Sequence, residues 1–317
     1  MTTDNRLHEI DTAKGIGILL VIIGHYISPG IIRELIYSFH MPLFFFIGGY
    51  LYKRKPFLFS IKKDFKRLIV PYIITGVILL CYYYALGYKH NDFSTAYSKT
   101  LAILYGCGAE GIQSKYFSWI PTSSPLWFLL ALFWCKNIYN VIPKYKVPIA
   151  ICIGIIAIYL QYYVINFPLC VLLGCSAMVF YAIGNMCKER VLFERYNWII
   201  VIICLLVWLY IGSHYGLYMY MSRWDNVLMN VIGAMCAIYL VFHLSRWLKL
   251  SIMEWLGRNS LSILCVHVFF FVPRIMKRFT ENVLLLSLND IFVSVLVIFG
   301  IQFLSNAIKK HTISKSQ

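Results

Sequence analysis

The chain has 317 residues, 60% of them hydrophobic and 13% charged, with a mean hydropathy of +0.72. Because soluble domains carry about 25% charged residues, this composition excludes an ordinary soluble enzyme and leaves no room for a separate soluble catalytic domain. In a membrane protein, a net charge of +16 is typically due to basic residues in the cytoplasmic loops. We therefore expect no nucleic-acid partner.

Apolar runs fill nearly the whole sequence. A transmembrane helix needs about 20 mostly apolar residues, and ten such ranges lie between the charged stretches: 13–30, 33–52, 67–87, 124–142, 147–164, 168–187, 197–214, 226–244, 259–277 and 288–308. The sequence therefore predicts an all-α, polytopic transmembrane bundle of about ten spans. Residues 1–317 are expected to form a single integral membrane domain.

The distribution of basic residues orients this bundle. A cytoplasmic N-terminus places 21 of the 29 Lys and Arg residues in inner segments and leaves 8 outside. Seven of the inner ones lie in the loop KRKPFLFSIKKDFKR, residues 53–67. Since cytoplasmic loops are enriched in Lys and Arg, both termini are predicted to be cytoplasmic.

The first range carries Lys14 near its inner end and His25 near its outer end. Eleven residues at 100° each come within about 20° of three whole turns, so the two side chains share one helix face, about 16 Å apart along the axis. That spacing suits a cofactor arm whose phosphates bind the cation while its reactive end meets the imidazole. The alternatives are a buried imidazole bonded to a neighbouring helix and a lysine that only reaches the membrane surface.

The second range begins SFHMPLFFFIGGY, with His40 just before Pro42 and a Gly48–Gly49 pair near its end. Proline and glycine allow a broken or closely packed helix whose backbone lines a cavity. His40 could then join His25 near the outer leaflet. Alternatively, Pro42 makes a kink and His40 only caps a helix end.

A basic cluster precedes the third range and includes Lys62, Lys63, Lys66 and Arg67. It could hold the phosphates of coenzyme A or the head groups of anionic lipids. Arg67 is the preferred member, because its guanidinium grips phosphate in a bidentate way, and Lys66 beside it is the second candidate from this cluster. Positive-inside topology alone would also place basic residues there.

In the ninth range, Ser260, His267 and Arg274 recur every seven residues, about two helical turns. Such a stripe is expected to face protein rather than lipid. His267 is a candidate for the active site or a packing hydrogen bond.

Motifs of several other enzyme classes are lacking. The chain has no Walker A sequence, no G-x-S-x-G elbow and no H-E-x-x-H, and the ten cysteines form no CxxC pair, so no metal is expected. Gly15 and Gly17 lack the third glycine of a dinucleotide fingerprint, which favours a role in close helix packing.

Four segments in chain order resemble the acyltransferase 3 family of polytopic membrane acyltransferases: EIDTAKGIGILLVIIGH, FHMPLFFFIGGY, RLIVPY and LGRNSLSILCVHVFF. PLWFL at 125–129 is similar to a fifth. The resemblance implies ten helices, a cytoplasmic acyl-coenzyme A donor and an acceptor hydroxyl on the outer side. By position, His25 matches the family's essential histidine and Lys14 its basic partner, while His40 and His267 match other recurrent positions.

The resemblance thus implies an O-acyltransferase of the bacterial cytoplasmic (inner) membrane that moves acetyl from acetyl-CoA to a saccharide or a lipid-linked glycan, with His25 as general base or as a transient acyl carrier. Gly48 replaces a serine common in the family. A transporter or flippase is the main alternative. We expect it less because acidic residues lie only at span ends, as Asp290 and Glu34 do. A structural scaffold would not require aligned Lys14 and His25.

Overall fold

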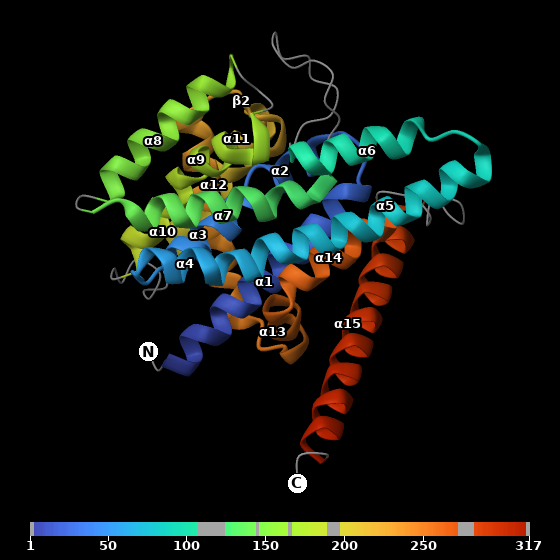
Figure 1. Ribbon diagram of the computed structural model, residues 1–317. Coiled ribbons are helices and arrows are strands. Elements are labelled where there is room, and N and C mark those ends of the chain that lie inside the picture. Colours follow the sequence, from blue (N-terminus) through green and yellow to red (C-terminus); the bar gives the residue numbers. More distant parts are fainter. Residues whose placement is uncertain are drawn as a thin grey trace.

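The computed structural model describes residues 3–106, 124–143, 146–163, 167–188, 197–271 and 282–314. Helices make up nearly all of this part of the chain (Figure 1). The α-helices are α1 Thr3–Tyr26, α2 Ile31–Tyr37, α3 His40–Tyr50, α4 Phe57–Asp64, α5 Val70–His90, α6 Ser94–Tyr105, α7 Trp127–Val141, α8 Lys146–Gln161, α9 Val171–Ser176, α10 Met178–Cys187, α11 Trp198–His214, α12 Val227–Trp247, α13 Ser251–Arg258, α14 Ser260–Phe271 and α15 Val283–Ser314.

Shorter elements connect them. A π-helical turn, Phe65–Ile69, joins α4 to α5, and 3₁₀ turns occupy Ser124–Leu126, Pro168–Cys170 and Met219–Met221. The strands β1 Leu217–Tyr218 and β2 Arg223–Trp224 pair antiparallel between α11 and α12.

Each of the ten ranges predicted from the sequence contains a helix, so the all-α class is confirmed. Four helical stretches among the described residues are long and apolar enough to cross a membrane: Ile31–Tyr50, Phe57–His90, Val227–Trp247 and Val283–Phe303. The pair Pro168–Ser176 and Met178–Cys187, bent by 44°, is a fifth candidate span. Ten spans and the cytoplasmic placement of both termini stay predictions.

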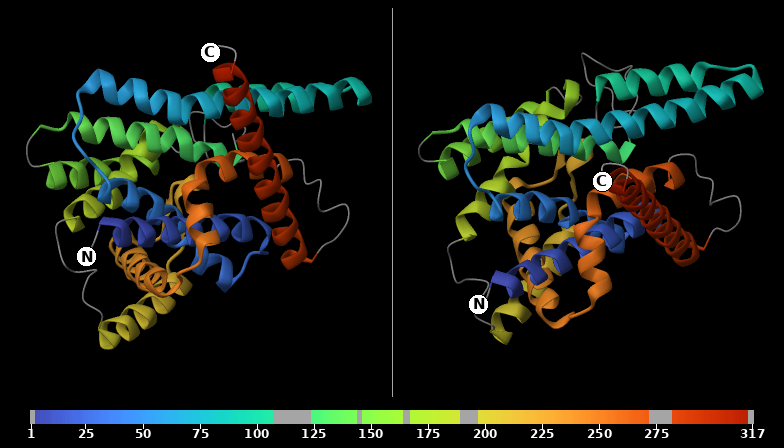
Figure 2. Two further views of the ribbon diagram at one scale, coloured as in Figure 1. Left: turned by 90° about the horizontal axis from the view of Figure 1, so that it is seen from below. Right: turned by 60° about the horizontal axis from the view of Figure 1, so that its bottom comes forward.

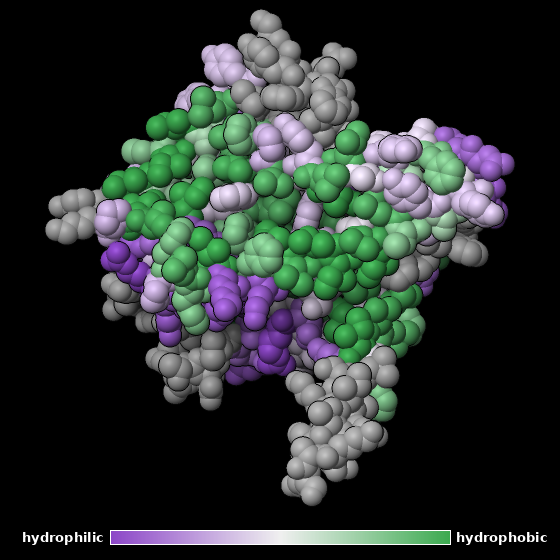
Figure 3. Space-filling view, viewed as in Figure 1, coloured by the Kyte–Doolittle hydropathy of each residue, from purple (hydrophilic) through white to green (hydrophobic). Residues whose placement is uncertain are grey.

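Apolar side chains also cover much of the outer surface. Figure 3 shows a broad hydrophobic band across the face that carries α5 and α7. On α11, Trp198, Ile199 and Leu206 are each more than 60% exposed. Exposed apolar area of this extent marks a surface that contacts lipid.

Two parts extend from the bundle: the antiparallel pair α5 and α6, seen in Figure 2, and the C-terminal end of α15, seen in Figure 1. The opposite end of α15 packs against α1 and α14. This docking brings α15 to the end of α1 that carries His25.

Close helix contacts fix the position of α1. A methyl group added at Gly15 would overlap the carbonyl oxygen of Met253, and one at Gly257 would overlap that of Asp11. The backbones of α1 and α13 therefore touch, as small residues permit. The prediction that Gly15 serves close helix packing is confirmed.

The second predicted range is broken. Phe39, with φ −142° and ψ −20°, separates α2 from α3, and α3 begins at His40. Pro42 lies in the first turn of α3, where its missing N–H needs no partner. The break therefore occurs before His40 rather than as a kink at Pro42.

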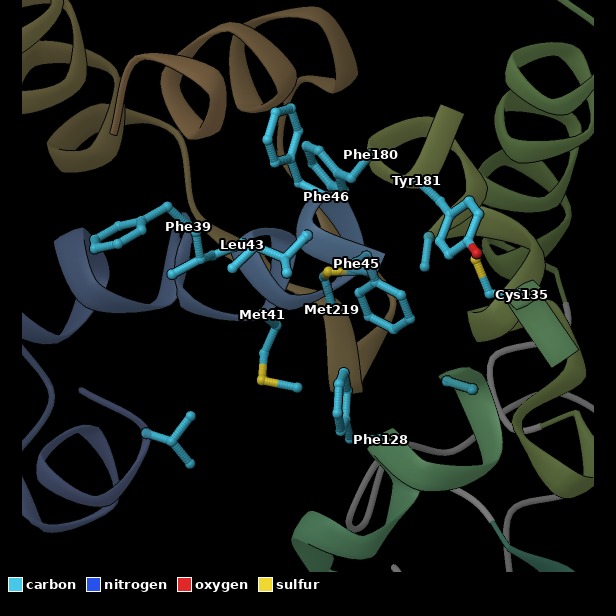
Figure 4. Packing of buried hydrophobic residues seen from close by; sticks show 14 of the residues in the cluster. Phe39, Met41, Leu43, Phe45, Phe46, Phe128, Cys135, Phe180, Tyr181 and Met219 are labelled. Carbon is cyan, nitrogen blue, oxygen red and sulfur yellow. The ribbon is translucent and has the colours of Figure 1, made fainter. Parts of the chain in front are cut away.

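The core gathers around α3. Leu43, Phe45 and Phe46 are completely buried, and they pack with Phe180 of α10 and Phe128 of α7 (Figure 4). A methyl group at Gly49 would overlap the carbonyl oxygen of Tyr181 on α10. α3 is thereby fixed between α1, α7 and α10.

Candidate active site

Helix α1 carries the predicted pair. Lys14 lines a pocket and forms an ion pair with Asp11, with 3.0 Å between Nζ and Oδ1. His25 lies in the last turn of α1 and is partly exposed. The helix thus spans from a basic pocket to an imidazole, as the spacing predicted.

The structure brings all three predicted histidines together. The ring of His25 stacks on that of His267, with 5.3 Å between centroids and 27° between planes. His40 and Arg33 also interact electrostatically with His25. His40 and His267 are buried, whereas His25 is partly exposed.

The side chain of His40, the first residue of α3, contacts α2 across the break between the two helices. Its Nδ1 lies 2.8 Å from the carbonyl oxygen of Ile36, and its ring contacts that of Tyr37 edge-on at 4.8 Å. The contact with Ile36 ties the two helices together, which fits the capping alternative as well as a place beside His25.

Asp290 is the site residue that sequence reasoning missed. It is completely buried well inside α15, so the expectation that it lies at a span end is wrong. His267 Nδ1 lies 2.6 Å from Asp290 Oδ2, the hydroxyl of Tyr26 donates to the same oxygen at 2.7 Å, and Ser294 donates to Oδ1 at 3.2 Å. The available signal was a carboxylate in an apolar run, which in a membrane segment usually has a partner.

The pocket beside Lys14 has a volume of about 290 Å³. Its cationic lining residues are Lys14, Lys53, Lys55, Lys63, Arg67, Lys136 and Arg258. Asp64 is the acidic residue among the described lining residues, and it is ion-paired with Lys136. Figure 3 shows hydrophilic side chains gathered below α4 and α5, at the edge of the apolar band.

Mutual repulsion shows in this cluster. A hydrogen bond with Lys63, partial burial, and the charges of Lys63 and Lys136 together lower the pKa of Lys55. Since cations packed against each other favour a bound anion, the pocket mouth suits phosphate groups. Of the two preferred members of the predicted cluster, Arg67 lines the pocket, whereas Lys66 is not among its lining residues.

The π-helical turn Phe65–Ile69 contains both of these residues and aims Arg67 into the pocket. A π turn inserts one extra residue per turn and is frequent at functional sites. Asp64 just before it is buried and holds α4 against Lys136 of α7.

The inner, apolar part of the pocket lining includes close chain neighbours of the three histidines. Val21 lies one helical turn before His25, Met41 follows His40, and Leu264 lies one turn before His267. Phe128 completes this inner lining, and Figure 4 shows it on the same side of α3 as Met41. The pocket lining thus combines cationic residues with chain neighbours of the three histidines, which are not themselves among its lining residues.

Aromatic residues pack near the end of α1 that carries His25, where the ring of Tyr37 lies against Gly24. The ring of Tyr37 lies 5.1 Å from that of Tyr218 on β1, and the guanidinium of Arg33 lies 5.0 Å from the Tyr37 ring. Glu34 accepts a hydrogen bond of 2.7 Å from the hydroxyl of Tyr218. Tyr37 and Tyr218 are themselves buried, so partly exposed Arg33 and Glu34 are the groups that a polar ligand such as a sugar could meet at this end.

Of the predicted stripe, Ser260 lines the pocket and His267 joins the histidine cluster, while Arg274 lies outside the described residues. No group of three or more His, Cys, Asp or Glu side chains among the described residues could hold a metal ion.

A family model described as an acyltransferase domain matches residues 7–305, nearly the whole chain. No curated protein and no solved structure matches it.

Proposed function

The chain belongs to this acyltransferase family and is a membrane acyltransferase; from that premise we propose that it is an O-acetyltransferase. The donor is cytoplasmic acetyl-CoA, and the acceptor is a hydroxyl of an extracytoplasmic or lipid-linked saccharide. His25 is the general base. The observation that carries this proposal is a pocket lined by cations and by chain neighbours of the stacked histidine cluster.

The pocket supports a coenzyme A donor through its charge pattern. Coenzyme A carries a diphosphate and a ribose phosphate at one end and a narrow, mostly apolar pantetheine arm at the other. Lys14 and Arg67 are among the cationic lining residues of the pocket, and Met41 is among its apolar ones. A charge-assisted hydrogen bond to phosphate is about twice as strong as a neutral one, so the mouth holds the phosphates and the arm extends inward.

The length of α1 matches that arrangement. Lys14 and His25 lie on one helix face, about 16 Å apart along the axis. With phosphates at Lys14, the extended arm brings the thioester beside His25.

The reaction then needs one proton acceptor. His25 takes the proton of the acceptor hydroxyl as its oxygen attacks the thioester carbonyl. A carbon–oxygen bond forms, the carbon–sulfur bond breaks, and the imidazolium returns the proton to the leaving thiolate. Alternatively, His25 itself carries the acetyl group between two such steps.

The aromatic residues on the other side of His25 support the acceptor. Tyr37 and Tyr218 are buried and support partly exposed Arg33, which supplies a donor at the end of α1 away from Lys14. With both termini cytoplasmic, this end faces the outside of the bacterial cytoplasmic membrane. Donor and acceptor then meet at His25 from opposite sides of a single ten-helix domain.

The test is release of free coenzyme A from labelled acetyl-CoA by the protein in proteoliposomes, with saccharide acceptors added. We expect His25→Ala to abolish release and the exposed His90→Ala to leave it unchanged. Full activity in a folded His25→Ala variant contradicts the proposal. Intact acetyl-CoA together with donor-independent sugar flux would instead indicate a transporter.

A further inference from the structure

A buried imidazole–carboxylate pair lies next to His25. His267 and Asp290 are both completely buried, with 2.6 Å between Nδ1 and Oδ2. A carboxylate inside a membrane helix is costly, by at least about 2.5 kcal/mol at the helix centre. Packing between α14 and α15 does not need a carboxylate, so Asp290 is expected to have a functional role.

The hydrogen bonds determine the tautomer of His267. An ionised carboxylate only accepts hydrogen bonds, and Tyr26 and Ser294 already donate to Asp290. His267 therefore also donates, so its Nδ1 carries the hydrogen. The neutral ring then presents Nε2 as a proton acceptor.

Helix α1 holds this pair directly against His25. Tyr26 is the residue after His25; its hydroxyl donates to Asp290 at 2.7 Å and its ring meets that of His267 edge-on at 6.4 Å. His25 stacks on the same His267 ring. Two consecutive residues of α1 thus hold the pair: His25 stacks on the His267 ring, and Tyr26 donates to Asp290, the partner of His267.

We propose that Asp290 is a positioning residue for acetyl transfer: it fixes the tautomer and orientation of His267 against His25 and compensates the proton that the histidine pair gains. This inference rests on the proposed function. While the acceptor oxygen attacks, the proton leaves the hydroxyl for His25. The cation that forms there lies near Arg33 and His40, and Asp290 supplies the opposing negative charge within this cluster.

Asp290→Asn is nearly isosteric and removes the charge. In the serine-protease triad, where the aspartate is bonded to the general-base histidine itself, the corresponding change lowers kcat about 10⁴-fold while leaving the geometry intact. Here Asp290 acts through His267 on His25, so we expect a fall in kcat of about 100-fold with the KM for acetyl-CoA unchanged. Tyr26→Phe removes one hydrogen bond to the charged carboxylate, and we expect kcat to fall about threefold to tenfold.

The assay measures coenzyme A release from acetyl-CoA with membranes of the source organism as acceptor, because these contain the natural saccharide. Asp92→Asn and Tyr97→Phe are matched controls on the exposed surface. Solid-state NMR of ¹⁵N-histidine protein provides a second readout. Wild-type His267 should carry its proton on Nδ1, and Asp290→Asn should change that tautomer.

Three results would overturn the inference. The first is kcat within twofold of wild type in folded Asp290→Asn, or in Tyr26→Phe if Asp290→Asn does not fold. The second is a wild-type His267 without a proton on Nδ1. In both cases, His25-dependent release by the wild type leaves the proposed function intact. If the wild type releases no coenzyme A, the proposed function fails and the inference fails with it.

Discussion

Replacing Gly15 by alanine adds a methyl group where α1 touches α13. The new Cβ would overlap the carbonyl oxygen of Met253 and lie 3.0 Å from its carbonyl carbon. The oxygen contact is the closer of the two; since non-bonded heavy atoms pack best at about 3.5–4.0 Å, the two backbones must separate by about 1 Å or more. A carbonyl of the main chain cannot rotate away as a flexible side chain can.

Overpacking of this kind typically costs about 1–3 kcal/mol. Alanine recovers up to about 1 kcal/mol of helix propensity relative to glycine, so we expect a net destabilisation of about 1–2 kcal/mol. The contact also borders the donor pocket, because Lys14 precedes Gly15 and Gly257 of α13 lines the pocket. The KM for acetyl-CoA should therefore rise as the melting temperature falls.

The assay compares melting temperature in detergent and donor KM for Gly15→Ala and Gly300→Ala. A methyl group at Gly300 would meet nothing within 4 Å, so this control should melt at or slightly above the wild-type temperature and keep its KM. Gly15→Ala behaving like the control would refute the close contact between α1 and α13.

Three further outcomes follow from the pocket. The pKa of Lys55 is lowered and a bound polyanion favours its charged form, so the affinity for acetyl-CoA should fall as pH rises through that pKa. In Lys55→Arg, which stays charged, the KM for acetyl-CoA should not rise over the same alkaline pH series. Parallel curves of KM against pH for the wild type and Lys55→Arg would contradict this. Met41→Ala should raise the kcat/KM ratio of butyryl-CoA to acetyl-CoA about tenfold by enlarging the inner end, whereas the same ratio in exposed Met186→Ala should not move. Lys136→Met should destabilise the fold by about 3 kcal/mol in thermal melting, because it strands the carboxylate of Asp64, and adding Asp64→Asn should restore stability.

The sequence alone determined the helical class and the two ends of the candidate site. Hydropathy is a local property, so each apolar range could be recognised as a helix without knowledge of its neighbours. The alignment of Lys14 with His25 also follows from the period of one helix. The ordered segments from Glu9 to Phe271 were enough to indicate the family that matches residues 7–305.

The periodicity of single helices could not predict which helices pack against each other. His25, His267 and Asp290 lie on three different helices, and only the docking of α14 and α15 against α1 brings an imidazole and a carboxylate together behind the first histidine. Lys136 and Arg258 likewise reach the basic pocket from helices far from residues 53–67 in sequence. The physical reason is that a helix presents the same stripe of side chains whichever neighbour it meets, and the choice among neighbours depends on close contacts such as those at Gly15 and Gly49, which form only when all the helices are packed.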